Sequence, residues 1–261
     1  MTKEKLIDCP VCGTEMVVRG NPTIQEVTRC PNCGHVYVDY PGDANEFHQH
    51  AYRVSTKHGR RGSKNEFDES FRFNEKFHLD RSEICSKRIK CLQDNLDLSK
   101  CSSMLDIGAG GGTFARWARA KLNMKSIECQ EISEICIKNL RMDGFPTYTG
   151  DFNSINWNGS DDNPGFDLVT CWHTLEHIND IKLFAEQVSK ITNKYLVIEV
   201  PLDERPNMGP VKTPSLNGWD GHHHFFTYES MALLFKGKFK SCTRTSKKGI
   251  QSPSLQVVLE K

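Results

Sequence analysis

One stretch of the sequence, residues 104–113, constrains the fold more than any other. It reads Met-Leu-Asp-Ile-Gly-Ala-Gly-Gly-Gly-Thr, and the run Phe-Ala-Arg-Trp-Ala-Arg-Ala follows at once. A short apolar run that ends in glycines and leads into an amphipathic, alanine-rich run predicts a buried parallel strand, a tight turn and a helix. The N-terminus of such a helix faces a ligand. We therefore expect an α/β fold with a nucleotide-type cofactor site at this turn.

The glycines and the acidic residue of this stretch indicate how a cofactor would bind. Gly108 and Gly110 have no Cβ, so the backbone can pass close to a ligand. Asp106 stands at the predicted strand end and can accept hydrogen bonds from a cationic or hydroxylated group. A glycine-rich loop that only joins strand to helix is the alternative. Acidic residues at later strand ends favour the cofactor site.

Two cofactors bind at turns of this kind, and the third glycine position separates them. A dinucleotide turn needs Gly-x-Gly-x-x-Gly or Ala, whereas the last position counted from Gly108 is Thr113. NAD is therefore the second choice. Residues 105–112 instead resemble the first motif of the class I S-adenosylmethionine-dependent methyltransferases, and the resemblance extends from about residue 96 to residue 261. It implies a Rossmann-like sheet flanked by helices, with an antiparallel last strand and S-adenosylmethionine as cofactor.

Four cysteines near the start of the chain form two knuckles, Cys9-Pro-Val-Cys12-Gly and Cys30-Pro-Asn-Cys33-Gly. Their spacing predicts a structural zinc ribbon, because four thiolates complete a tetrahedral shell with no open position for catalysis. A redox Cys-x-x-Cys pair is the alternative, but one pair would suffice for it and a thioredoxin-like context is absent.

The ribbon is expected to span residues 1–44. Residues 15–18 and 26–28 can form its short strands, and residues 35–38 close the module with an alternating pattern. A module of about 40 residues lacks the core to fold alone, so the metal ion supplies the fold.

Charge and cysteine usage narrow the class of protein. A net charge of +1 argues against a strongly electrostatic nucleic-acid binder. No secretory signal opens the sequence and no apolar run is long enough to span a bilayer, so we expect a cytoplasmic protein without a membrane partner. The seven cysteines outside the knuckles show no ligand spacing and are expected to be buried or incidental thiols.

Residues 45–98 are predicted to be a helical lid or linker, with a helix over about residues 65–95 and an apolar stripe of Ile84, Ile89 and Leu92. In the family that the chain resembles, helices before the first strand close over the cofactor. A helical linker packed on the sheet is the equal alternative. Residues 53–90 hold eleven Lys or Arg against six Asp or Glu, which more often marks a solvated helix face than an anion-binding surface.

Two glutamates compete for the ribose of the cofactor. Residues 125–131 are predicted to be the second strand, and Ser133 the N-cap of the next helix. An acidic residue at the end of this strand can accept hydrogen bonds from both ribose hydroxyls. The order of acidic residue, one further residue and serine resembles the family pattern and favours Glu131. Glu128 remains the alternative.

The adenine side of the cofactor is expected after the third strand, which ends at residues 150–152. A carboxylate there can accept a hydrogen bond from the adenine amine, and an adjacent aromatic ring can cover the ring face. Asp151 and Phe152 resemble the family's adenine-side residues in position and type.

The fourth strand, from about residue 165, reaches Trp172 and His173 at its carboxyl end. Ligands bind outside the carboxyl ends of parallel strands. We therefore expect Trp172 to contact the cofactor, and His173 to lie near the methyl donor as a candidate catalytic residue. The Leu-Glu-His run at residues 175–177 resembles a segment that is more often architectural than catalytic in the family, so His177 is expected to support the site.

A helix over residues 181–191 and a buried strand over residues 195–201 follow. Residues 202–220 have no periodicity and predict a long loop of the kind that covers active sites. Thr227 is expected to cap a helix over residues 228–235, and a final antiparallel hairpin is formed by the segments 239–245 and 255–260.

A histidine triplet begins at His222. In sugar and small-molecule branches of the family, a comparable His-x-x-x-Phe-Ser/Thr segment lies across the substrate pocket, and His222 matches its histidine base, although Gly221 replaces the usual acidic neighbour. Histidine titrates near neutral pH, so His222 or His224 can act as general base. Consecutive loop residues are poor simultaneous metal ligands. A purely structural role for the loop is the equal alternative to base or substrate contact.

The sequence thus predicts a zinc ribbon followed by a helical segment and, over residues 99–261, a methyltransferase domain. The acceptor that fits the histidine loop best is a hydroxyl of a small molecule, such as a sugar or nucleotide-sugar. RNA methylation guided by the ribbon is the rival activity, but a base-holding Asn-Pro-Pro-Tyr-type motif is absent after the fourth strand. A non-catalytic ribbon protein that keeps a cofactor fold is the third hypothesis, and the intact set of acidic strand ends argues against it.

Overall fold

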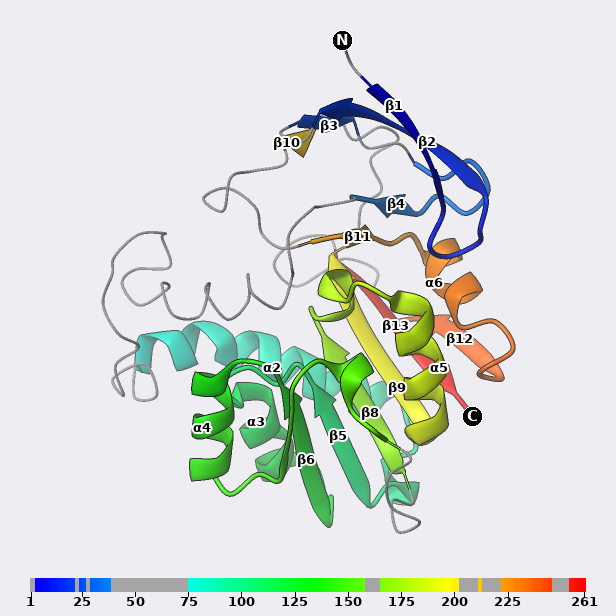
Figure 1. Ribbon diagram of the computed structural model, residues 1–261. Helices are drawn as coiled ribbons and strands as arrows, with labels where there is room; N and C mark the ends of the chain where they lie inside the picture. The colour runs from blue at the N-terminus through cyan, green and yellow to red at the C-terminus, as the bar shows by residue number, and fades with distance from the viewer. Residues whose placement is uncertain are drawn as a thin grey trace, which may run out of the picture.

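A seven-stranded sheet forms the centre of the molecule (Figure 1). The structure, a computed structural model, describes residues 3–21, 24–26, 29–38, 75–157, 165–201, 211–212, 222–245 and 254–261. The strands of the central sheet are β5 (Ser103–Ile107), β6 (Ser126–Glu131), β7 (Thr147–Thr149), β8 (Phe166–Trp172), β9 (Thr192–Pro201), β12 (Ser241–Arg244) and β13 (Ser254–Glu260). Their order is β12-β13-β9-β8-β5-β6-β7.

Strand direction agrees with the predicted fold class. Neighbouring strands in the spatial series β7, β6, β5, β8 and β9 pair in parallel. Strand β13 pairs antiparallel with both β9 and β12. This confirms an α/β sheet of the Rossmann-like kind with an antiparallel final hairpin. The fifth parallel strand starts at Thr192, three residues before the predicted start, because it follows helix α5 without a loop.

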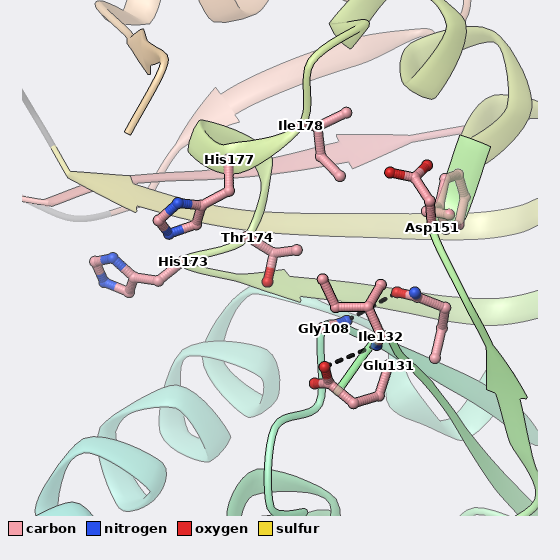
Figure 2. A pocket seen from close by; sticks show the side chains of 10 residues that line it. Gly108, Glu131, Ile132, Asp151, His173, Thr174, His177 and Ile178 are labelled. Atoms are coloured by element: carbon pink, nitrogen blue, oxygen red, sulfur yellow. Dashed lines mark hydrogen bonds between the residues drawn. The ribbon is translucent and has the colours of Figure 1, made fainter. Parts of the chain in front are cut away.

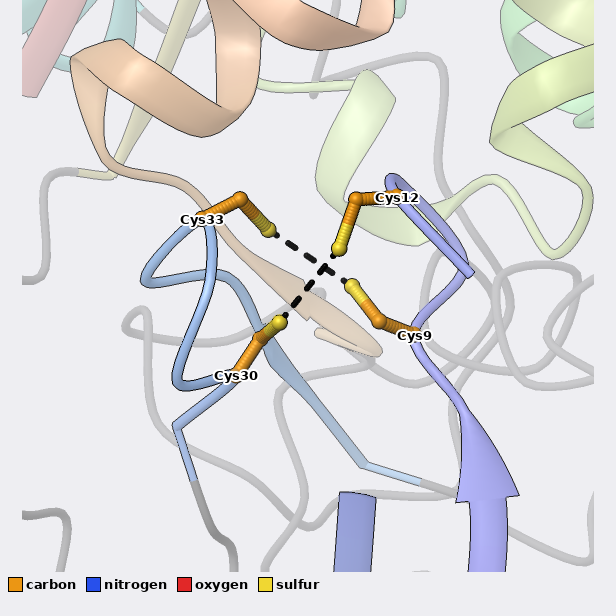
Figure 3. Close-up of side chains that lie close together, drawn as sticks. All are labelled: Cys9, Cys12, Cys30 and Cys33. Carbon is orange, nitrogen blue, oxygen red and sulfur yellow. Dashed lines mark hydrogen bonds between the residues drawn. The ribbon is translucent and has the colours of Figure 1, made fainter. Parts of the chain in front are cut away.

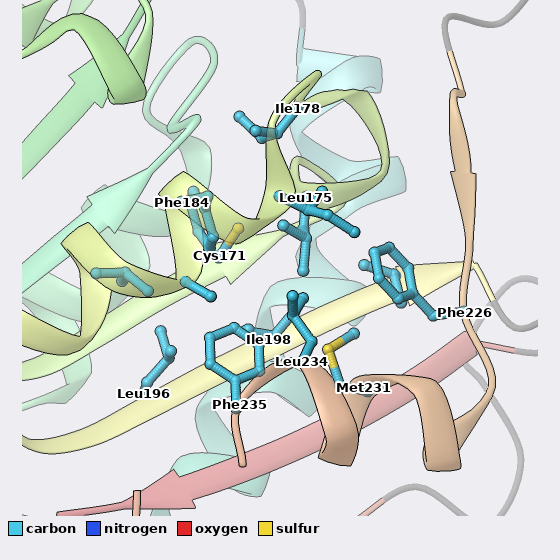
Figure 4. Packing of buried hydrophobic residues seen from close by; sticks show 14 of the residues in the cluster. Cys171, Leu175, Ile178, Phe184, Leu196, Ile198, Phe226, Met231, Leu234 and Phe235 are labelled. Carbon is cyan, nitrogen blue, oxygen red and sulfur yellow. The ribbon is translucent and has the colours of Figure 1, made fainter. Parts of the chain in front are cut away.

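Helices cover both faces of the sheet (Figure 1). They are α2 (Glu75–Asn95), α3 (Thr113–Lys121), α4 (Glu134–Met142), α5 (Ile181–Ile191) and α6 (Tyr228–Leu234), with 3-10 turns η2 (Leu98–Lys100), η3 (Phe152–Ser154) and η4 (Leu175–His177). Buried residues of α2, α3 and α4 share one cluster with one face of the strands. Those of α5 and α6 pack on the other face, where Phe184 and Met231 lie near Ile198 (Figure 4). Both α5 and the Thr227 cap of α6 are as predicted.

Helix α2 packs on the sheet, as the linker hypothesis expects. Ile89 and Leu92 of the predicted stripe are buried, while Ile84 is half-buried and Cys85 and Arg88 complete the buried side. The part of the predicted lid before Glu75 lies outside the described residues, and so does most of the predicted loop 202–220. In the described part of the chain, no helix has the length and apolarity to cross a membrane.

The N-terminal ribbon contains strands β1 (Lys3–Asp8), β2 (Glu15–Asn21), β3 (Ile24–Glu26) and β4 (Val36–Tyr37), and two later strands join it, β10 (Val211–Lys212) and β11 (His224–Phe225). Strands β1, β2, β3 and β10 form one sheet, and β4 pairs with β11. Sequence reasoning missed β1 because its charged sequence has little apolar alternation, and pairing along the full length of β2 holds it in place.

The ribbon joins the larger unit through the segment that contains the histidine triplet. The amide of Val38 donates to the carbonyl of His223 (2.8 Å), and the hydroxyl of Thr227 donates to the carbonyl of Cys33 (3.2 Å). Phe226 is fully buried, and its ring centroid lies 4.8 Å from that of His35. Main-chain pairing and apolar packing therefore fix the ribbon against the central sheet.

Asp106 is a charged residue within the core of the sheet. It is 1% exposed on β5, and the hydroxyl of Thr170 on β8 donates to its Oδ1 (2.8 Å). Burial raises the pKa of this carboxyl to about 7, and the hydrogen bond from Thr170 only partly opposes the shift. A carboxyl whose pKa is raised on folding makes the protein less stable as pH rises from its unfolded pKa to its folded pKa.

We expect Asp106→Asn to remove this pH dependence, because the amide oxygen can still accept from Thr170 but carries no charge. Relative to this variant, the wild type should lose roughly 2 kcal/mol of unfolding free energy between pH 5 and pH 7. Urea unfolding at several pH values measures the difference. A constant difference across this window would show that Asp106 is ionised throughout.

Candidate functional site

A hollow that opens to solvent lies at the carboxyl ends of the parallel strands (Figure 2). The residues that line it follow β5, β6, β7 and β8, and are Gly108, Gln130, Glu131, Ile132, Asp151, Phe152, His173, Thr174, His177 and Ile178. It therefore lies where parallel sheets bind their ligands.

The glycine turn after β5 forms one wall of this cavity. Gly108 has a φ of 66°, and a Cβ at this position would stand 2.2 Å from the hydroxyl of Thr174. The turn therefore requires glycine there on two counts, backbone conformation and space. The amide of Gly108 donates to Oε1 of Gln130 (3.1 Å), whose amide in turn donates to the carbonyl of Gly150 (2.7 Å). Gln130 thus ties the turn to the end of β7.

The two predicted ribose glutamates have different surroundings. Glu131 lines the cavity and accepts from the amides of Gly110 (2.6 Å), Ile132 (2.8 Å) and Ser133 (2.9 Å). A carboxylate has about four acceptor sites, so capacity is left for a hydroxyl donor. Glu128 instead accepts from the hydroxyl of Tyr148 (2.9 Å) and does not line the cavity. The geometry favours Glu131.

Asp151 and Phe152 also line the cavity. Oδ1 of Asp151 caps η3 by accepting from the amide of Asn153 (2.7 Å). The ring of Phe152 is buried, with its centroid 4.9 Å from that of Trp157 and 4.8 Å from that of Phe184. Both residues are held firmly enough to present a carboxylate and a flat apolar edge to a ligand.

Trp172 was expected to contact the cofactor, but its side chain is not among the described residues that line the cavity. Side chains alternate along a strand, so Trp172 follows Leu168 onto the face that α2 and α3 cover. Its ring centroid lies 5.0 Å from that of Phe114, and the Arg88 guanidinium lies 4.8 Å above it. Asp106 is buried beneath the turn rather than at the cavity wall.

His173 is held between two carboxylates at the end of β8. Its Nδ1 lies 3.2 Å from Oε1 of Glu176, and its Nε2 lies 3.2 Å from Oε1 of Glu199. Burial by itself lowers the pKa of His173, but the two carboxylates outweigh this and raise the pKa to about 9. At neutral pH the ring is a cation, so the prediction that His173 acts as a base is not supported.

Arg88 is the second cation of this network. Its guanidinium bonds Oε1 of Glu199 through Nη2 (2.5 Å) and Nε (3.1 Å), and Gln256 donates to the other oxygen of Glu199 (3.2 Å). Burial by itself raises the pKa of Glu199, but the neighbouring His173 and Arg88 outweigh this and hold the pKa below its usual value. The network joins α2, β9 and β13 to the end of β8.

His224 is also wrong as a candidate base. It is 1% exposed, lies on β11, and its Nδ1 is 3.1 Å from Nε2 of His35 in the ribbon. Burial, reinforced by the neighbouring His35, holds the pKa of His224 well below its usual value. The side chain is part of the contact between ribbon and sheet. The reason is strand pairing between distant segments, which the local sequence does not reveal.

His222 is the predicted base that remains near the cavity. Its Nε2 lies 3.9 Å from Oε1 of Glu176, and its ring centroid is 4.7 Å from that of the cavity-lining residue His177. Its side chain is 19% exposed, so a ligand can reach it. Sequence reasoning treated the Leu-Glu-His run as architecture and missed Glu176. The imidazoles of His173, His177 and His222 surround this carboxylate. A glutamate shortly after the end of the fourth parallel strand was the sequence signal that could have indicated the cluster.

The four knuckle cysteines converge in the ribbon (Figure 3). The sulfur of Cys9 lies 3.6 Å from that of Cys33, and the sulfur of Cys12 lies 3.5 Å from that of Cys30. Zinc with bonds of about 2.3 Å in a tetrahedron would place its sulfurs about 3.8 Å apart. The arrangement thus fits one ion with four thiolate ligands.

The family described as methyltransferase domain matches residues 77–238. No curated protein matches the chain.

Solved methyltransferases share the fold at low sequence identity. The DhpI complex with S-adenosylhomocysteine has a TM-score of 0.55 at 12% identity, covering 83% of this chain and 96% of that one. A putative O-methyltransferase from Nostoc punctiforme PCC 73102 has a TM-score of 0.53 at 16% identity, covering 85% and 73%. Magnesium protoporphyrin IX methyltransferase from Synechocystis PCC 6803, with bound S-adenosylmethionine, has a TM-score of 0.52 at 11% identity, covering 86% and 100%.

The family match spans well over half of the chain, and it includes the glycine turn, the cavity and η4. The chain therefore belongs to the methyltransferase-domain family.

Proposed function

We propose that this enzyme methylates a hydroxyl group of a small molecule, such as a sugar or nucleotide-sugar. The observation that carries the proposal is the cluster of Glu176, His177 and His222 beside the cavity. A hydroxyl must lose its proton as it is methylated, and a histidine with a carboxylate behind it is suited to take that proton. A nitrogen acceptor with a free lone pair would need no such group.

We assign the cofactor to the cavity residues. Bound S-adenosylmethionine supplies an electrophilic methyl group on a positively charged sulfur. Glu131 would hold the ribose hydroxyls, Asp151 the adenine amine and Phe152 the adenine ring, while Gly108 and Gly110 let the turn approach the ligand. The protein's part is chiefly to position donor and acceptor in line.

His222 is the residue that we assign to the acceptor proton. His173 is a cation, and His224 is buried against the ribbon, so neither can accept this proton at neutral pH. His222 lies near Glu176, whose pKa remains below its usual value because the histidines around it outweigh its burial. The charge of Glu176 would stabilise an imidazolium formed at His222.

We further propose that the ribbon binds one structural zinc ion. The support is the geometry of four sulfurs within 4.8 Å of one another, two of them contributed by each knuckle. A cytoplasmic location fits this proposal, because reduced thiols persist there.

The activity itself is tested by product analysis. The enzyme is incubated with methyl-labelled S-adenosylmethionine and, in parallel, with a small-molecule cell extract, purified nucleotide-sugars and total RNA. We expect the label in a small molecule, on an oxygen, by mass spectrometry. Label found only in RNA, or only on nitrogen or carbon, would refute the proposed acceptor class.

Cofactor binding is tested at the two competing glutamates. Glu131→Gln should weaken S-adenosylmethionine binding by about 10- to 100-fold, because a charged acceptor for hydroxyl donors is worth about 1.5–3 kcal/mol. Glu128→Gln is the matched control and should leave the affinity unchanged, since Glu128 contacts Tyr148 instead. Calorimetry measures both, with NAD as a ligand that should not bind. Equal effects of the two variants would contradict the assignment.

The ribbon is tested by metal analysis of the intact chain. The wild type should contain one tightly held zinc ion, and Cys30→Ser should lose it, because three thiolates no longer close the shell. S-adenosylmethionine binding should survive, since the described residues that line the cavity all belong to the larger unit. Cys242→Ser, in strand β12, is the control and should keep the ion. Retention of zinc by Cys30→Ser would refute the four-cysteine site.

A further inference from the structure

Glu176 is an unusual residue because its carboxylate is fully buried and surrounded by imidazoles. Its Oε1 lies 3.2 Å from Nδ1 of His173, 3.9 Å from Nε2 of His222 and 4.0 Å from Nε2 of His177. Among the residues that the structure describes, its Oε2 is buried without a hydrogen-bond partner. Buried carboxylate oxygens are nearly always bonded, so an unpaired one needs an explanation.

The donor set of this cluster is that of a metal site. One oxygen of Glu176 and one nitrogen each of His177 and His222 all lie within 4.8 Å of one another. A carboxylate with two imidazoles suits divalent ions from manganese to zinc, which bond these atoms at about 2.0–2.2 Å. Ligands on such an ion lie about 3–3.5 Å apart, so the present separations of 3.9 and 4.0 Å require only small side-chain rotations.

The backbone holds the three ligands together from two distant parts of the chain. Glu176 and His177 belong to η4, and the amide of His223, next to His222, donates to the carbonyl of Glu176 (2.9 Å). The ribbon secures the other side of this segment through the β4–β11 pairing. Consecutive histidines are poor simultaneous ligands, but here His222 is the only member of the triplet in the cluster, and its partners come from η4.

We propose that Glu176, His177 and His222 bind a divalent transition-metal ion that coordinates the hydroxyl of the methyl acceptor. Three protein ligands leave open positions for a substrate, as catalytic metal sites require. The role of the ion rests on the proposed function, but the site itself rests only on the cluster.

The ion would change how the acceptor proton is removed. With the ion bound, coordination would lower the pKa of the acceptor hydroxyl, its proton would pass to solvent water, and His222 would act as a ligand. Without the ion, His222 keeps the role of base that the proposed function gives it. The acceptor oxygen then bonds the methyl carbon while the carbon–sulfur bond breaks. The electron pair of that bond stays on sulfur, which becomes a neutral thioether. No oxidant or reductant is needed.

The test is a cobalt titration of the full-length protein after its ribbon has been saturated with zinc. We expect one further ion per chain, with visible d–d absorption but without the sulfur-to-cobalt charge-transfer band that thiolates give, because the cluster contains no cysteine. His222→Ala should weaken cobalt binding by at least about 10- to 100-fold. Elemental analysis after the titration should count one zinc and one cobalt ion per chain in the wild type, and only the zinc ion in this variant.

Two controls keep the outcomes distinct. Glu128→Gln removes a carboxylate that contacts Tyr148 and should leave the cobalt titration unchanged. S-adenosylmethionine affinity of His222→Ala should equal that of the wild type, which shows that the variant is folded. Absence of a second ion in the wild type, or unchanged cobalt affinity in His222→Ala, would overturn the metal site.

The outcome for the metal site is separable from that for the proposed function. If no second ion binds but a small-molecule hydroxyl is methylated, His222 remains the base and the proposed function stands. If the ion binds but the label appears only in RNA, the site stands and the proposed acceptor falls. Mn²⁺, followed by its paramagnetic resonance, repeats the test with a second probe.

Discussion

The imidazolium of His173 between Glu176 and Glu199 is the interaction on which the site depends. Two buried carboxylates each cost several kcal/mol unless a cation and hydrogen bonds compensate. His173 supplies the cation for both, and its left-handed backbone, with a φ of 52°, aims the ring between them. Such a conformation is uncommon outside glycine and marks positions where structure and function coincide.

This network also explains how the helix before the first strand of the central sheet contributes to the site. Arg88 reaches from α2 to Glu199 and at the same time covers the ring of Trp172. The helix therefore does more than link two modules. It carries the second cation that compensates the buried charge of Glu199, and it joins α2, β9 and the end of β8 in one network beside the cavity.

The parts that the sequence predicted are those governed by local patterns. The strand, turn and helix around Gly108 follow from apolar periodicity and glycine placement, and the N-cap position of Ser133 fixes Glu131 as the last residue of β6. The prediction that Trp172 contacts the cofactor placed it at the cavity because it ends a strand, and did not consider that successive side chains of a strand point to opposite faces of the sheet. His224 failed because the pairing of β11 with the ribbon joins segments about 190 residues apart, which no local pattern encodes.

The pairing of β4 with β11 has a consequence for how such a protein can be shortened or recombined. A chain trimmed to the region that matches the methyltransferase family would leave the edge of β11 without its partner and would uncover the apolar ring of Phe226. Unpaired strand edges and exposed aromatic surface promote aggregation. A ribbon exchanged between related proteins would therefore need to be transferred together with the segment around β11 that pairs with it.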